Sequence, residues 1–312
     1  MLEKILVPLD GSEFGEQALP LAESLARMYS GVTELHLVHV HVAVPVFLEG
    51  VATLSPEVET DREALEREYL ASTAHTLEDR WPGPVHTALL QGPADRALDT
   101  YAEEQDVGLV VMSTHGRGGV TRVWLGGVAD RLMRRIRRPL LVFRPEEGGR
   151  SVGESPWPSN SDLSNILVPL DGSTLSERIL PHASTLATET GASLQLLRVL
   201  PPLFVVGKSS TGTFYPREEA ILRELEEEAE EYLDGWVQRL EEEGLKVEKR
   251  VLSGAEPAKG ILEVAREEET DLIAMATHGR SGVPRAVLGS VADKVVRGAR
   301  RPVLAVRPQE GD

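Results

Sequence analysis

The stretch VPLDGS occurs twice in the chain, at Val7–Ser12 and again at Val168–Ser173. Two more pairs of segments follow it in the same order: THGRGG at 114–119 with THGRSG at 277–282, and RRPLLVFRP at 137–145 with RRPVLAVRP at 300–308. Repetition of ordered motifs at a long, nearly constant spacing indicates two copies of one folding unit.

A polar segment without periodicity, EEGGRSVGESPWPSNSDLS at 146–164, separates the two copies. Its glycine, proline and serine content is typical of a linker. The chain has 312 residues, which suits two domains of ordinary size. We therefore expect a first domain over residues 1–146, a linker over 147–163 and a second domain over 164–312.

Within each copy, short apolar runs of β-favouring residues alternate with helical patterns, which is typical of βαβ units and a mainly parallel sheet. We expect strands in the first copy near 4–9, 34–41, 85–90, 108–113 and 140–144, with helices near 13–29, 57–80, 94–105 and 127–136. The second copy repeats this order, and its longest helix, near 217–243, carries an apolar stripe expected to be buried: Ile221, Leu225, Tyr232, Trp236 and Leu240. The predicted fold class is α/β, with two doubly wound, Rossmann-like, five-stranded parallel sheets in tandem and strand order 3-2-1-4-5.

The amino-acid composition disfavours or excludes several classes of function. The net charge of −17 disfavours nucleic acid as a partner, because the average field would repel a phosphate backbone. The chain has no cysteine, which excludes disulfides and thiolate chemistry. No secretion signal opens the sequence and no apolar run approaches the roughly 20 residues of a membrane span, so we expect a cytoplasmic protein.

The repeated motifs fall where a ligand would bind. In an open parallel sheet, ligands bind outside the carboxyl ends of the strands where the strand order reverses, here between the first and fourth strands. One strand end carries Pro8, Leu9 and Asp10 in the first copy and Pro169, Leu170 and Asp171 in the second. The other carries Ser113, His115, Gly116, Arg117 and Gly119 in the first copy and Ala276, Thr277, His278, Gly279, Arg280 and Gly282 in the second.

The glycines after the fourth strand and at the start of the last helix are suited to binding an anion. Gly126-Gly127 and Gly289-Ser290 start the last helix of each copy. Glycine lets backbone amides approach a phosphate, and a helix N-terminus supplies unpaired donors. The alternative for each glycine is a tight turn without a ligand.

Asp10 and Asp171 face this phosphate loop across the predicted crevice. A carboxylate there would accept hydrogen bonds from an adenine amine or a ribose hydroxyl. The alternative is a structural helix N-cap, a role that Ser12 or Ser173 could take instead.

At this constellation the sequence resembles the universal stress protein family, in particular its tandem members and its ATP-binding branch. The resemblance covers both copies and implies an adenine nucleotide alpha hydrolase-like fold that binds ATP, AMP or ADP, with Mg²⁺ as an optional companion. The family's glycine pattern is filled by Gly116 with Gly126-Gly127 and by Gly279 with Gly289-Ser290, whereas Ser113 and Ala276 replace its first glycine. Because Gly127 lacks the expected hydroxyl, the second copy is predicted to be the better site. The resemblance also implies backbone contacts from Val40 and Val199 to adenine.

Motifs that are more specific for a catalytic function are absent from the sequence. The sequence contains no Walker-type P-loop and no GxGxxG after the first strand. His115 and His278 are candidates for acid–base catalysis. However, no second histidine or paired carboxylate lies at the spacing of a catalytic dyad or a metal site. We therefore predict that these histidines orient the loop and that the chain has no metal site. Arg117 and Arg280 either clamp phosphate or face solvent.

These observations lead to one expected function with two alternatives. We expect a nucleotide-dependent stress-response module with slow or absent hydrolysis and an unidentified protein partner. The alternatives are a slow ATPase or nucleotide hydrolase and a ligand-free adaptor scaffold. The resemblance further implies an internal pseudo-dimer of the two domains through their closing strands, and pairing of whole chains into a homodimer is left open.

Overall fold

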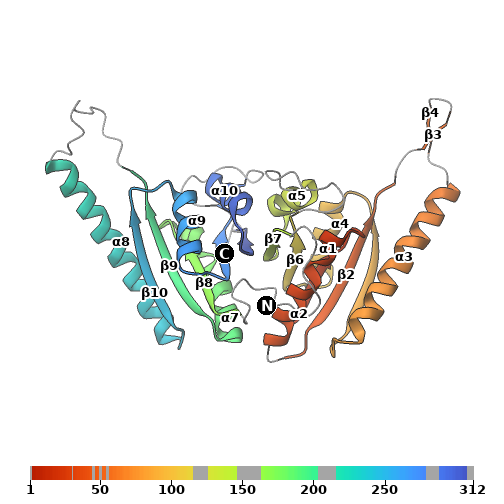
Figure 1. Ribbon diagram of the computed structural model, residues 1–312, viewed down its shortest axis with the longest axis horizontal. Coiled ribbons are helices and arrows are strands. Elements are labelled where there is room, and N and C mark those ends of the chain that lie inside the picture. Colours follow the sequence, from red (N-terminus) through yellow and green to blue (C-terminus); the bar gives the residue numbers. More distant parts are fainter. Residues whose placement is uncertain are drawn as a thin grey trace. The chain divides into compact units, whose positions relative to one another are not determined.

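The computed structural model describes residues 2–29, 31–43, 46–48, 51–53, 56–114, 126–145, 163–202, 216–278 and 288–307 (Figure 1). They belong to two compact units, one within 1–160 and the other within 161–310. The predicted linker, 147–163, lies outside the described residues except for Leu163. Each unit is an α/β domain built on a parallel sheet, which confirms the predicted tandem α/β fold.

The first unit contains a sheet of order β5-β2-β1-β6-β7 in which all neighbours run parallel. Numbered along the chain, these strands have the order 3-2-1-4-5. The bounds are β1 Lys4–Pro8, β2 Glu34–His41, β5 Val85–Gln91, β6 Leu109–Ser113 and β7 Leu140–Phe143. Its helices are α1 Glu13–Glu16, α2 Ala18–Met28, α3 Pro56–Glu78, α4 Ala94–Glu104 and α5 Gly127–Arg135.

The second unit repeats this arrangement with the order β10-β9-β8-β11-β12. Its strands are β8 Asn165–Pro169, β9 Ser193–Leu200, β10 Val247–Ser253, β11 Leu272–Ala276 and β12 Val303–Val306. Its helices are α6 Thr174–Glu177, α7 Leu180–Thr190, α8 Pro216–Glu242, α9 Pro257–Glu267 and α10 Ser290–Gly298.

The central strands are buried on both faces because helices cover both sides of each sheet. Every residue of β6 and of β11 is buried, as expected for strands of a doubly covered parallel sheet. In the first unit α2 packs on β1 and β6, α3 packs on β2 and β5, and α4 packs on β2, β5 and α5. Figure 1 shows α3 lying along β2. The helices cover the faces of the sheet, so only loops and helix ends lie at the carboxyl ends of the strands.

The helix predicted near 13–29 is divided. α1 ends at Glu16 and α2 begins at Ala18. Pro20 has no amide hydrogen and so cannot bond the carbonyl of Glu16, which explains the break. Pro181 stands in the same relation to Glu177 in the second unit, between α6 and α7.

Two other features differ from the sequence expectation. A small antiparallel hairpin, β3 Val46–Leu48 with β4 Val51–Thr53, was not predicted. Of the stripe predicted on α8, only Leu240 is buried, while Leu225, Tyr232 and Trp236 are half-buried and Ile221 is 40% exposed. Leu233, which the predicted stripe did not include, is buried as well. In the described chain, no helix combines the length and apolar character needed to cross a membrane.

Candidate functional site

A cavity of about 320 Å³ lies in the second unit, where the carboxyl ends of β8, β9 and β11 meet the first turns of α9 and α10. β8 and β11 are neighbours in the sheet although two strands separate them in the chain, so the cavity stands at the switch point that the sequence predicted. Nine of the predicted residues line it: Pro169, Leu170, Asp171, Val199, Ala276, Thr277, His278, Gly289 and Ser290. Gly279, Arg280 and Gly282 lie outside the described residues.

Asp171 shapes the turn that follows β8. Its Oδ1 accepts hydrogen bonds from the amide of Ser173 at 2.9 Å and from its hydroxyl at 2.5 Å. The Ser173 hydroxyl in turn accepts from the amide of Ser176 at 3.2 Å and caps α6. The serine is therefore the helix cap, and the aspartate fixes its orientation while lining the cavity.

The start of α10 presents backbone amides to the cavity. The first helical hydrogen bond runs from Asp293 N to Gly289 O at 2.9 Å. The amides of Ser290, Val291 and Ala292 come before it and have no carbonyl partner within the helix. All three residues line the cavity, so the positive end of the helix faces it.

Gly289 is required by a close backbone approach. Its amide donates to Thr277 O at 2.9 Å, and a Cβ on Gly289 would lie 2.7 Å from the same oxygen. A larger side chain cannot fit unless the backbone shifts. The glycine thus holds the start of α10 against the end of β11.

Arg198 also lines the cavity, although the sequence analysis did not select it. It is only 7% exposed, its Nη1 donates to Leu170 O at 3.2 Å, and its guanidinium lies 5.8 Å from the centre of the Tyr232 ring. A cation at this wall favours anionic ligands. The sequence feature that could have identified it is a single charged residue within the otherwise apolar end of strand β9, LLRVL.

The rest of the cavity wall is mainly apolar. Leu197, Leu200, Ile261 and Met275 contribute to it from β9, α9 and β11. A predominantly apolar wall with a few convergent polar groups is typical of small-molecule sites, and the volume falls at the lower end of their range of about 300–1,000 Å³. The arrangement can hold a flat apolar ring at one side and an anion at the helix terminus.

The first unit has the same local frame at the corresponding positions. Ser12 caps α1, with Asp10 Oδ1 accepting from its hydroxyl at 2.5 Å. Gly126 N donates to Thr114 O at 2.7 Å. Of the other predicted residues, Pro8 ends β1, Leu9 follows it, Val40 lies in β2, Ser113 ends β6 and Gly127 starts α5. His115, Gly116, Arg117 and Gly119 lie outside the described residues.

The two units differ at the end of their second strand. His39 and His41 of β2 occupy the positions that correspond to Arg198 and Leu200 of β9, when each strand is aligned through its register with the first strand of its own unit. His41 Nδ1 lies 2.7 Å from Glu66 and its Nε2 lies 2.7 Å from Glu59. Burial alone would lower the pKa of His41, but the hydrogen bonds to these two carboxylates raise it. A charged cluster therefore replaces the apolar wall that Leu200 provides in the second unit.

Comparison with known proteins agrees with the tandem α/β fold. The model of the universal stress protein family matches residues 1–144 and 163–307. A universal stress protein of Mycolicibacterium smegmatis is 28% identical over 317 residues, covering 98% of this chain and 97% of the relative. One of Methanocaldococcus jannaschii is 37% identical over 142 residues, covering 46% of this chain and 81% of the relative. The crystal structure of a universal stress protein from Archaeoglobus fulgidus has a TM-score of 0.67 at 20% identity and covers 99% of this chain and 97% of that one, which shows a shared fold.

Proposed function

Because the chain belongs to the universal stress protein family, we propose that it binds an adenine nucleotide, ATP or AMP, in the cavity of the second unit and acts as a nucleotide-dependent regulatory module of the stress response. The observation that carries this proposal is the convergence of three helix-terminal amides and an apolar wall on one cavity. A phosphate suits the first and an adenine ring suits the second.

Several residues have specific roles in this proposal. Ser290, Val291 and Ala292 supply donors to the phosphates, and Gly289 keeps them in position. Val199 offers backbone contacts to adenine, and Asp171 accepts from the ribose or the base. Gly279 and Arg280 complete the phosphate loop in the family pattern.

Regulation fits the cavity better than fast hydrolysis. Asp171 is the one carboxylate among the described lining residues, and its Oδ1 is already engaged by Ser173. His278 Nδ1 lies 2.9 Å from the hydroxyl of Thr277. With this set of groups Mg²⁺ would depend on the nucleotide itself for most of its oxygen ligands.

The substitution Ser290→Glu tests the proposal. A carboxylate in the first turn favours helix α10 through the helix dipole, so the fold is retained. The same charge repels a phosphate at that terminus. We expect ATP affinity, measured by calorimetry on the full chain, to fall at least about tenfold, which is a loss of about 1.4 kcal/mol.

Gly127→Glu in the first unit is the matched control and should leave the affinity unchanged. Adenosine, which carries no phosphate, should lose less affinity than ATP in the Ser290→Glu variant. Absence of ATP binding by the unmodified chain at millimolar concentration, or equal effects of the two substitutions, would overturn the assignment of the cavity.

A further inference from the structure

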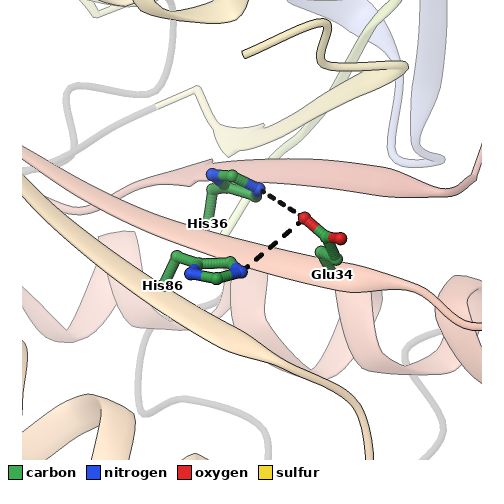
Figure 2. Close-up of side chains that lie close together, drawn as sticks. All are labelled: Glu34, His36 and His86. Carbon is green, nitrogen blue, oxygen red and sulfur yellow. Dashed lines mark ion pairs between the residues drawn. The ribbon is translucent and has the colours of Figure 1, made fainter.

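A second group of ligand-type side chains lies in the first unit, at the opposite end of the strands from the phosphate loop. Glu34 and His36 are two residues apart at the start of β2 and so share one face of the sheet. His86 of β5 stands directly opposite His36 in the parallel register. Figure 2 shows the three side chains converging over these two strands, and their ligand atoms all lie within 4.8 Å of one another.

His36 is held so that one of its ring nitrogens faces the other two residues. The side chain is buried, and its Nδ1 lies 2.9 Å from the hydroxyl of Tyr101 on α4. Its Nε2 is also buried and makes no hydrogen bond. A buried polar nitrogen without a hydrogen bond is costly and calls for an explanation.

A direct ion pair does not supply that explanation. His36 Nε2 lies 3.5 Å from Glu34 Oε2, which is longer than a normal hydrogen bond. The carboxylate of Glu34 therefore leaves this nitrogen without a hydrogen bond.

A small divalent cation bound between the three side chains would satisfy this nitrogen. The distances from Glu34 Oε2 to the Nε2 atoms of His36 and His86 are 3.5 and 3.6 Å. Bonds of about 2.0–2.1 Å around tetrahedral zinc place neighbouring ligand atoms about 3.3–3.5 Å apart. Two imidazoles and one carboxylate form a three-ligand set of the kind that leaves a fourth position for water.

We propose that Glu34, His36 and His86 form a zinc-binding site on the first unit. The ion enters from solvent, since the side chains of Glu34 and His86 are 37% and 51% exposed. Tyr101 is the outer partner that fixes the ring of His36, as hydrogen-bond partners of metal-bound imidazoles do. Lys4 lies beside Glu34 on β1, but its ammonium donates to Gln105 O at 3.0 Å.

The second unit provides an internal comparison. The residues at the same register positions are Ser193 and Gln195 on β9 and Glu248 on β10. This set contains no imidazole. The proposed site therefore belongs to one copy of the fold only, and it does not depend on the nucleotide cavity of the other.

Zinc titration of the full chain tests the site. The protein is treated with a chelator, freed of nucleotide, and titrated with Zn²⁺ against a competing indicator dye. We expect one Zn²⁺ per chain with micromolar or tighter affinity. His86→Ala and Glu34→Gln should each weaken binding at least about tenfold, or about 1.4 kcal/mol. Both side chains are partly exposed, so neither change should prevent folding.

His75→Ala, which removes an exposed histidine of α3, is the matched control and should leave the affinity unchanged. Co²⁺ in place of Zn²⁺ should give the intense visible absorption of a tetrahedral ion, and His86→Ala should abolish it. Lack of stoichiometric binding by the unmodified chain, or equal affinity in His86→Ala and His75→Ala, would refute the site. Because no nucleotide is present, the result stands apart from the test with ATP.

Discussion

Among single residues, two glycines of the second unit share a backbone conformation but not an environment. Gly172 has a φ of +77° and Gly191 a φ of +75°. A Cβ on Gly191 would meet nothing within 4 Å, whereas a Cβ on Gly172 would lie 2.9 Å from Arg198 Nη1. Gly191 is required by conformation alone, whereas Gly172 is also required by the position of a buried arginine at the cavity wall.

The substitutions Gly172→Ala and Gly191→Ala separate these two requirements. Both introduce a Cβ in the left-handed region, which costs roughly 1–2 kcal/mol of stability. Only Gly172→Ala also displaces Arg198, so only this variant should weaken ATP binding, by several fold. Urea denaturation measures the first effect and calorimetry the second. If both variants bind ATP equally well, Arg198 makes no contribution to the site.

For individual residues of the cavity, the sequence predicted some structural roles and missed others. The sequence left Asp171 and Ser173 as alternative helix caps, since either side chain can accept from a terminal amide. The structure assigns the cap to Ser173 and the orientation of its hydroxyl to Asp171. Arg198 was not foreseen because nothing in the local pattern shows that an apolar strand ends at a cavity. The binding role of these residues stays a prediction.

Among the elements, the central strands β1, β6, β8 and β11 were predictable because parallel strands buried on both faces are nearly continuous apolar runs. The break between α1 and α2 was missed although Pro20 marks it. The histidines of β2 and β5 were missed for another reason. His36 and His86 meet only through the register of two strands, and register depends on the whole sheet.

The contact between α3 and β2 should depend on pH. His41 of β2 lies between Glu59 and Glu66 of α3, and Arg62 lies 3.3 Å from Glu59. Hydrogen bonds to these carboxylates raise the pKa of His41 against the effect of burial. Because the folded-state pKa exceeds the unfolded value of about 6.5, the stabilisation is complete below that pH and is lost as pH rises through the folded-state pKa.

His41→Gln should therefore destabilise the first unit more at about pH 6 than at about pH 9. Hydrogen bonds to charged groups are worth about 1.5–3 kcal/mol, so the low-pH difference should be measurable by urea denaturation. His75→Gln, at an exposed position of the same helix, is the control for a general effect of losing a histidine. A pH-independent loss of stability in His41→Gln would show that the imidazole is neutral in the folded protein.

In the whole molecule, the two copies keep one fold while their second strands specify different chemistry. β2 reads ELHLVHVH and β9 reads SLQLLRVL. The histidines of β2 serve the proposed zinc site at one end of the strand and the carboxylate cluster at the other. The arginine and leucine of β9 line the cavity instead. Pairing of the two copies through their closing strands, which the family resemblance implies, stays a prediction.

Hydrogen exchange on the full chain, with ATP and Zn²⁺ added in separate experiments, should resolve this division of roles. ATP should slow exchange in the second unit, at the end of β11 and the first turn of α10, because a bound phosphate occupies the amides of Ser290, Val291 and Ala292. Zn²⁺ should slow exchange in the first unit, at β2 and the edge strand β5, because the ion ties these strands together. Peptides from β9 and β10 serve as the control for zinc, since their register positions lack imidazoles. Protection of the same unit by both ligands would mean that the copies have not divided these roles, and that the difference between the two second strands lies in packing alone.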